Sequence, residues 1–272
     1  MRRKQKVLLV LFSVISFFTI YGCRLKTKRY FREAEKLERE GKYNEAEKLY
    51  RQIATRYHED TFAADSIFRA GEINFLYLEN YQQSLKDHLL LIKEYPKSVY
   101  APRAQWRIAL IYDKTFNNPT SAIVEYQRLI DNYFFPELVE QAYYNLGNCF
   151  FKLNKFNQAI TEFTILLNYN PNGKYADDAV FRIGDSYFME GRLDDAIRTY
   201  DKVLKNYPES ELVLEAKFCI GKSLEEKGML EEALKIFNQI EDAYDNKELL
   251  VRRIKQVEKK VKLKNKKYKV KW

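Results

Sequence analysis

The chain has 272 residues, of which 46% are hydrophobic, so it can bury a substantial core; only 9 glycines and 6 prolines argue against a β-sandwich and for long helices. Its formal charge of +9 lies at the two ends, because residues 1–6 carry +4 and residues 247–272 carry +10, which leaves −5 for residues 7–246. The basic composition therefore gives no support for a nucleic-acid-binding body, and no nucleic acid is expected among the partners.

Residues 1–22 have the pattern of an export signal. A short basic segment precedes sixteen uncharged residues, Val7 to Gly22, a stretch suited to a signal peptide and short for a membrane span. It ends at Gly22-Cys23, which resembles the lipobox where bacterial lipoprotein signals are cleaved and the cysteine is acylated. The sequence thus predicts lipidation of Cys23 and a short anchor linker over residues 23–27. An uncleaved anchor and an ordinary secretion signal are the alternatives.

The residue after the cysteine indicates a location. It is Arg24 and not aspartate, and by analogy with Gram-negative sorting this favours the periplasmic face of the outer membrane. Anchoring in the inner membrane and a periplasmic location are the alternatives. Several acyl chains would make the anchor stable where one chain is marginal.

A six-residue turn recurs six times between residues 28 and 245 and closes each time on a small residue. These small residues are separated by 38, 38, 37, 37 and 37 positions, a near-constant period that defines a solenoid repeat. Each copy is expected to be a helix, a turn whose Gly or Asn suits a left-handed residue, and a second helix that crosses the first closely. The small residues are Ala46, Ser84, Ala122, Ala159, Ala196 and Ala233.

The first helix of each copy carries a second signature, which matches the tetratricopeptide repeat (TPR). This resemblance predicts an all-α, right-handed TPR-like α-solenoid of six helix-turn-helix repeats over residues 28–245. The clearest matches are Tyr143-x2-Leu146-Gly147-x2-Phe150 and Val180-x2-Ile183-Gly184-x2-Tyr187.

The period exceeds the usual 34 residues by about one helical turn. The extra residues precede the first helix, as in residues 95–101 (YPKSVYA). Repeats of this kind resemble two families of periplasmic TPR proteins: BamD-type lipoproteins, which help insert outer-membrane β-barrels, and YbgF-type proteins, which work with the Tol-Pal system. A lipobox followed directly by repeats resembles the BamD type. That resemblance implies a lipid-anchored scaffold that binds other envelope proteins or peptides through its concave groove.

Two alternatives to the BamD type stay open. One is a Tol-Pal or cell-division coordinator of the YbgF type, and the other is a generic TPR lipoprotein that acts as an adaptor for an envelope complex. No enzymatic role is expected. Residues 216–223 match a relaxed phosphate-loop pattern, but the repeat register puts them inside a first helix, where a phosphate loop cannot form.

Cofactors and metals are not expected either. The two histidines have no metal-ligand spacing, and no serine elbow, zincin motif or dinucleotide loop is present. Cys149 and Cys219 lie two repeats apart, too far for a disulfide between stacked hairpins, and are interpreted as small buried apolar residues.

An aromatic residue occupies one position of every first helix, three residues before the pattern glycine or its alanine equivalent. In TPR folds this position points toward the concave groove, which favours binding of an extended peptide or a partner helix; packing between repeats explains the rings equally well. These aromatic ladder residues are Phe31, Phe68, Trp106, Tyr144, Phe181 and Phe218, and seven residues further on lie Phe75, Phe151 and Phe188. The candidate partner-binding residues are Phe68, Trp106, Tyr144, Phe151, Phe181, Phe188 and Phe218.

The basic C-terminal segment shows helical spacing of apolar residues at Leu250, Ile254, Val257 and Val261. It is interpreted as a capping helix over residues 246–263 that shields the last hairpin from water. Residues 264–272 are expected to be a disordered basic tail able to contact anionic lipid headgroups.

Overall fold

The computed structural model describes residues 25–133 and 135–269, with side chains through residue 265. The chain is divided into two compact units, one that ends at Tyr133 and one that begins at Phe134. Within the described residues every regular element is a helix, which confirms the all-α prediction.

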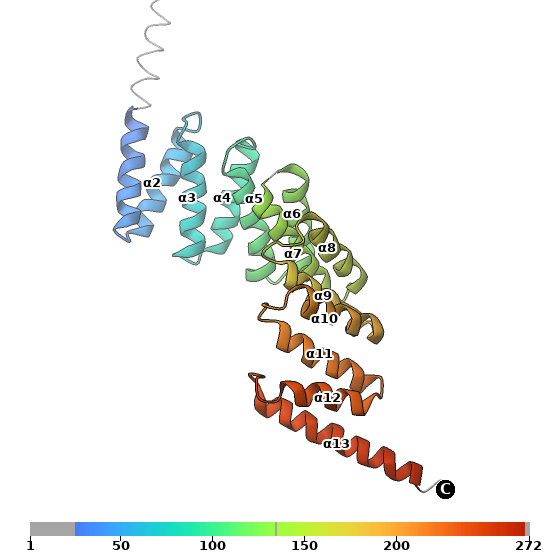
Figure 1. The fold of residues 1–272 in the computed structure, drawn as a ribbon. Helices are drawn as coiled ribbons and strands as arrows, with labels where there is room; N and C mark the ends of the chain where they lie inside the picture. Colours follow the sequence, from blue (N-terminus) through green and yellow to red (C-terminus); the bar gives the residue numbers. More distant parts are fainter. Residues whose placement is uncertain (1–24, 134, 270–272) are drawn as a thin grey trace, which may run out of the picture. The chain divides into compact units, whose positions relative to one another are not determined.

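The first unit is a stack of helical hairpins, in which each helix packs against the next one along the chain (Figure 1). A helix over residues 25–39 opens the stack. The others are α2 (Tyr43–Arg56), α3 (Ala63–Leu76), α4 (Tyr81–Glu94), α5 (Ala101–Leu110), the π-helix η1 (Ile111–Thr115) and α6 (Pro119–Asn132).

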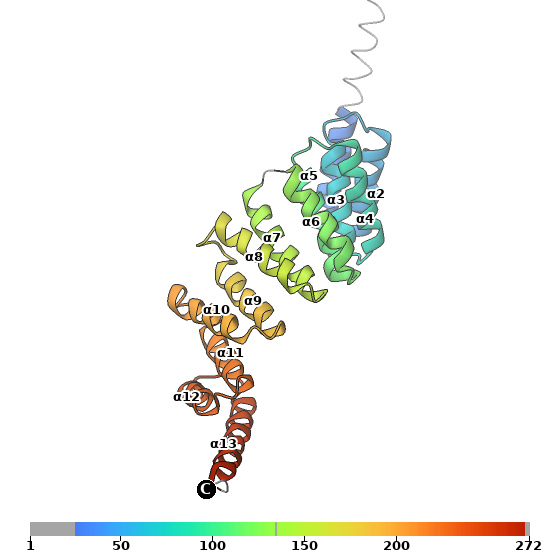
Figure 2. The same ribbon diagram turned by 90° about the vertical axis from the view of Figure 1, so that its right-hand side faces the viewer.

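The second unit repeats the arrangement, again with consecutive helices in contact (Figure 2). Three hairpins are followed by one long basic helix. The helices are α7 (Pro136–Lys152), α8 (Phe156–Tyr169), α9 (Ala176–Met189), α10 (Leu193–Asn206), α11 (Val213–Glu226), α12 (Leu230–Ile240) and α13 (Lys247–Lys269).

Each hairpin is held by a close helix crossing. The six small residues that close the turns are fully buried, at 0% exposure, as the repeat pattern predicts. Four first helices also carry a glycine that faces the aromatic ring of the second helix, and a Cβ there would come within 2.5–2.8 Å of that ring. The glycines therefore set the distance at which two helices pack. The pairs are Gly71–His88, Gly147–Phe163, Gly184–Tyr200 and Gly221–Phe237.

The turns contain the left-handed residue that the sequence predicts. Gly191 has φ 74° and Asn154 has φ 56°, and Gly41 and Gly228 behave alike. In the second hairpin Glu79 adopts the same left-handed conformation, with φ 51°. A residue with a side chain adopts this conformation at a cost in free energy.

A π-type turn explains why two of the repeats are 38 residues long and the others 37. Phe68 and Ser84 are 16 positions apart, whereas Tyr144 and Ala159 are 15 positions apart. The extra residue is absorbed at the end of the first helix, where Leu78 N–H donates to the carbonyl five residues before it at 3.1 Å. In the third hairpin the extra residue is accommodated in the same way, and the end of the first helix forms the π-helix η1. The register of the helices is thus preserved across both hairpins.

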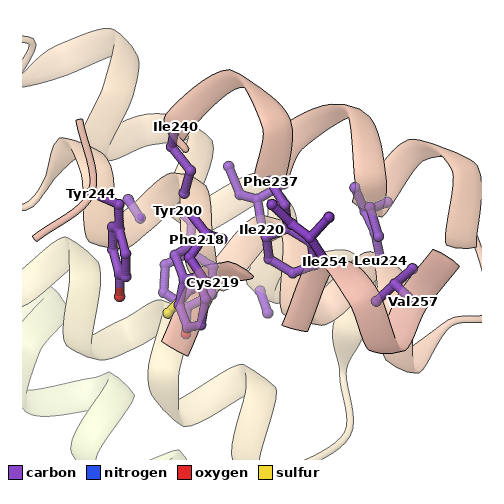
Figure 3. Close-up of a cluster of buried hydrophobic side chains, with 14 of the residues drawn as sticks. Tyr200, Phe218, Cys219, Ile220, Leu224, Phe237, Ile240, Tyr244, Ile254 and Val257 are labelled. Carbon is purple, nitrogen blue, oxygen red and sulfur yellow. The ribbon is translucent and has the colours of Figure 1, made fainter. Parts of the chain in front are cut away.

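The last helix covers the final hairpin through a stripe of buried apolar residues. Leu250, Ile254 and Val257 pack into one cluster with Ile220 and Phe237 of α11 and α12. Figure 3 shows Ile254 and Val257 in this cluster. Exposure of these three residues is at most 8%, so α13 does shield the hairpin, as a capping helix must.

The predicted boundaries at the two ends need correction. α13 continues to Lys269, so residues 264–269 are helical and not disordered, because lysine is a good helix former and no Gly or Pro interrupts the segment. At the other end, residues 25–27 of the predicted linker already belong to the first helix, where Thr27 is fully buried. Residues 1–24 and 270–272 lie outside the described residues.

Candidate partner-binding face

The aromatic ladder residues pack inside the hairpins. Each ring contacts the aromatic residue of the second helix in its own hairpin, with ring centroids 5.3–6.0 Å apart. Phe31 and Phe218 are 6% and 5% exposed, and the other four rings are half-buried. The pairs are Phe31–Tyr50, Phe68–His88, Trp106–Tyr126, Tyr144–Phe163, Phe181–Tyr200 and Phe218–Phe237.

Four ladder rings also pack on a ring that enters the next hairpin. Phe68 stacks on Tyr100 with centroids 5.0 Å apart, and Tyr144 stacks on Tyr175 at 4.9 Å. Phe218 likewise stacks on Tyr244 at 4.9 Å, and Phe31 packs on Phe62 in a tilted arrangement at 4.7 Å. Since Tyr100 belongs to the extra segment before a first helix, that segment serves packing between repeats. The contacts support the packing interpretation of the ladder, and partner binding by Phe68, Trp106, Tyr144, Phe181 and Phe218 stays a prediction.

The phenylalanines seven residues further on lie beneath cations from the next hairpin. In the first unit the Arg107 guanidinium lies 4.2 Å from the Phe75 ring centroid and donates to both carboxylate oxygens of Glu72, at 2.7 and 2.5 Å. In the second unit Arg182 lies 4.2 Å from Phe151 and donates to Asn148 at 3.0 Å. An arginine that follows a ladder ring therefore bridges two neighbouring first helices.

The next crossing in the second unit lacks this arginine. Cys219 occupies the position on α11 that follows the ladder ring, and Phe188 and Asp185 on α9 correspond to Phe75 and Glu72. The space left open is a cavity of about 220 Å³. We call it the α11 cavity; it is lined by Phe151, Asp185, Phe188, Met189, Tyr200, Cys219 and Lys222.

Two candidate residues from the sequence, Phe151 and Phe188, meet in the α11 cavity. The sequence reasoning missed the other lining residues, because it considered aromatic positions alone. Arginine follows four of the ladder rings, asparagine follows Tyr144 and cysteine follows Phe218. The cysteine points to a site only when the cross-helix contacts of Arg107 and Arg182 are known.

The negative charge of Asp185, the carboxylate in the α11 cavity, is only partly balanced by its neighbours. Asp185 accepts hydrogen bonds from the Tyr200 hydroxyl at 2.8 Å and from Arg182 at 2.9 Å. Burial raises the pKa of Asp185, and these two partners do not reverse that shift. For Glu72, by contrast, the two hydrogen bonds from Arg107 and the nearby His88 ring, 3.4 Å away, outweigh burial and lower the pKa to about 2.

The cysteines are buried thiols. Burial raises the pKa of the Cys219 thiol to about 12, so it stays protonated at neutral pH. Both Cys149 and Cys219 are buried, as the sequence predicts. Residues 216–223 lie inside α11, which confirms that they form no phosphate loop. The part of the chain that the structure describes gathers no three metal-ligating side chains.

The membrane anchor predicted at Cys23 lies outside the described residues. Among the helices of residues 25–133 and 135–269, none is both long and apolar enough to cross a bilayer.

Comparison with known families identifies the repeat. Tetratricopeptide-repeat family models match residues 103–133, 140–172 and 178–210, which are the third, fourth and fifth predicted repeats. A sequence comparison with curated proteins gave no match.

Solved structures agree with this fold. The C-terminal part of a TPR repeat-containing protein from Cytophaga hutchinsonii has a TM-score of 0.58 at 16% identity and covers 78% of each chain. PilW, a type IV pilus biogenesis factor, has a TM-score of 0.55 at 14% identity, covering 83% of this chain and 98% of its own. YrrB, a TPR protein with an unusual peptide-binding site, has a TM-score of 0.52 at 19% identity, covering 69% and 90%.

The fold and these comparisons define the class of the protein. Three of its repeats match tetratricopeptide-repeat models, and the described residues form an all-helical solenoid of the TPR type.

Proposed function

We propose that this protein is a lipid-anchored periplasmic scaffold that binds other envelope proteins and performs no catalysis. The observation that carries the proposal is the α11 cavity, an open site between first helices that joins apolar rings to charged groups. Pockets of this composition bind side chains of a partner, since the rings supply contact area and the charges give orientation. The description of YrrB as having an unusual peptide-binding site supports peptide recognition on this fold.

The proposed location depends on the N-terminus. Gly22-Cys23 after an uncharged segment supports acylation of the cysteine, and Arg24 supports the outer membrane over the inner membrane. Acylation would leave the repeats in the periplasm, where envelope proteins are available as partners.

The proposed process is outer-membrane protein assembly, as in the BamD type. The direct passage from the lipobox into the repeats supports this choice. A Tol-Pal or cell-division coordinator of the YbgF type is the second candidate, supported by the same extra segment before each first helix. Co-purification with a barrel insertase is expected for the first candidate, and self-association in analytical ultracentrifugation for the second.

Affinity capture of the full chain from solubilised envelopes, followed by mass spectrometry, tests the proposal. We expect discrete partner proteins with the wild type and at least about a tenfold loss with Phe188→Ala, because this ring lines the α11 cavity. Lys202→Ala is the matched control, since this exposed residue lies on the second helix of the same hairpin. Equal capture by both variants, each shown to be folded by its melting temperature, would contradict the proposal.

A further inference from the structure

At two other crossings between first helices, an arginine occupies the position that corresponds to the α11 cavity. Arg107 spans from α5 to Phe75 and Glu72 on α3, and Arg182 spans from α9 to the ring of Phe151 on α7. In both, the guanidinium stacks on a phenylalanine and donates to a polar side chain one turn before it. The repeat thus defines a small binding site for a guanidinium group.

At the third crossing this site is present and the arginine is absent. Phe188 supplies the aromatic ring and Asp185 the hydrogen-bond acceptor, but the small side chain of Cys219 leaves a cavity of about 220 Å³. That volume is several times the ~30 Å³ share of a water molecule, so it has room for a side chain. Figure 3 shows the short side chain of Cys219, which ends at its sulfur, in the buried cluster with Tyr200 and Phe218.

We propose that the α11 cavity binds an arginine side chain of a partner protein, with its guanidinium stacked on Phe188 and paired with Asp185. This inference rests on the proposed function, because it names the chemistry of the partner. Arginine is preferred to lysine, since a planar guanidinium can stack on the ring and donate to the carboxylate at once.

The charges already in the cavity are compatible with this ligand. The Lys222 ammonium lies 4.9 Å from the Phe188 centroid, and no ion pair joins it to a carboxylate in the described residues. Lys222 is half-buried, and on this proposal an incoming arginine takes its place over the Phe188 ring. Burial raises the pKa of Asp185 although the nearby charges of Arg182 and Lys222 oppose the shift, whereas the pKa of Glu72, which Arg107 contacts through two hydrogen bonds, is lowered.

The three methionines of the chain offer a direct readout, since Met189 lines the cavity and Met229 does not. The full chain is labelled with ¹³C-methyl methionine and titrated with the capped peptide Gly-Gly-Arg-Gly-Gly. We expect a saturable shift of the Met189 methyl resonance and none of Met229. The matching lysine peptide should bind at least about threefold more weakly, and the glutamate peptide should cause no shift.

Three variants test the assignment. Cys219→Arg should abolish the shift by filling the site, Asp185→Asn should weaken binding about tenfold, and Lys222→Ala should strengthen it. Binding of the glutamate peptide, lost in Lys222→Ala, would overturn the proposal in favour of an acidic ligand. Absence of any shift up to about 50 mM arginine peptide, far above the millimolar range of weak sites, would overturn it too.

The two proposals fail in different ways. If arginine peptides do not bind while partner capture persists, only the inference about arginine is wrong. If the peptide binds but no envelope protein is captured, the proposed scaffold function is wrong.

Discussion

The ion pair between Glu72 and Arg107 predicts how the first unit responds to acid. Both side chains are mostly buried, at 22% and 17% exposure, and the pair joins α3 to α5. His88 from α4 lies 3.4 Å from the same carboxylate. Glu72→Gln removes the charge and keeps the shape, so the variant isolates the electrostatic contribution to stability.

The magnitude follows from the pKa of Glu72, which falls from an ordinary 4.5 to about 2 on folding. A difference of about 2.5 pKa units corresponds to about 3 kcal/mol, and solvent screening of the partly exposed pair reduces this to about 2 kcal/mol. Because the pKa is lowered in the folded state, the stabilisation is complete above pH 4.5 and is lost as the pH falls toward 2.

Urea denaturation followed by circular dichroism measures this difference. At pH 7 we expect Glu72→Gln to unfold about 2 kcal/mol more easily than the wild type, and at pH 2.5 the two proteins should differ by less than about 1 kcal/mol. Glu248→Gln is the matched control: its pair with Arg252 is 85% and 65% exposed, so the change should stay within about 0.5 kcal/mol. A Glu72→Gln deficit that is equal at both pH values would refute the reasoning.

Three further predictions concern the turns, the ladder and the anchor. Glu79→Gly should stabilise by about 1 kcal/mol and Gly191→Ala destabilise by about as much, because both positions have positive φ; a less stable Glu79→Gly protein in chemical denaturation would contradict this. Tyr144→Ala and Phe181→Ala should each lower stability by about 3 kcal/mol, since both rings pack on the second helix; unchanged melting temperatures would show that they are not packing residues. Cys23→Ser should abolish labelling by a palmitate analogue, and a wild type that never takes up label would rule out the anchor.

The helices were predictable because their signal is repeated. A turn that closes on a small residue recurs at a fixed period, so six weak local patterns reinforce one another and define the helical hairpins. The buried Ala46 and Ala196 and the left-handed Gly191 follow directly from that register. The end of α13 was not predictable from hydrophobic periodicity, since its last residues are mostly lysine, which favours a helix without marking a buried face.

The α11 cavity could not be predicted from residue types alone. Its existence depends on contacts between side chains that are more than thirty positions apart, such as Arg107 with Glu72 and Arg182 with Asn148. Once those contacts are known, the exception at Cys219 becomes informative, because a small side chain replaces a bridging one. The ladder rings differ, because their recurrence is visible in the sequence. The structure shows that packing between helices accounts for much of this recurrence.

Site-specific photocrosslinking in living cells tests the central claim most directly. A photoreactive residue is placed at Met189, which is 54% exposed and lines the α11 cavity, and in a second strain at Lys202 on α10. The scaffold account predicts a discrete crosslinked envelope protein at Met189 that is absent at Lys202 and is lost when Phe188→Ala is added. No crosslink at Met189, or the same products at both positions, would contradict it.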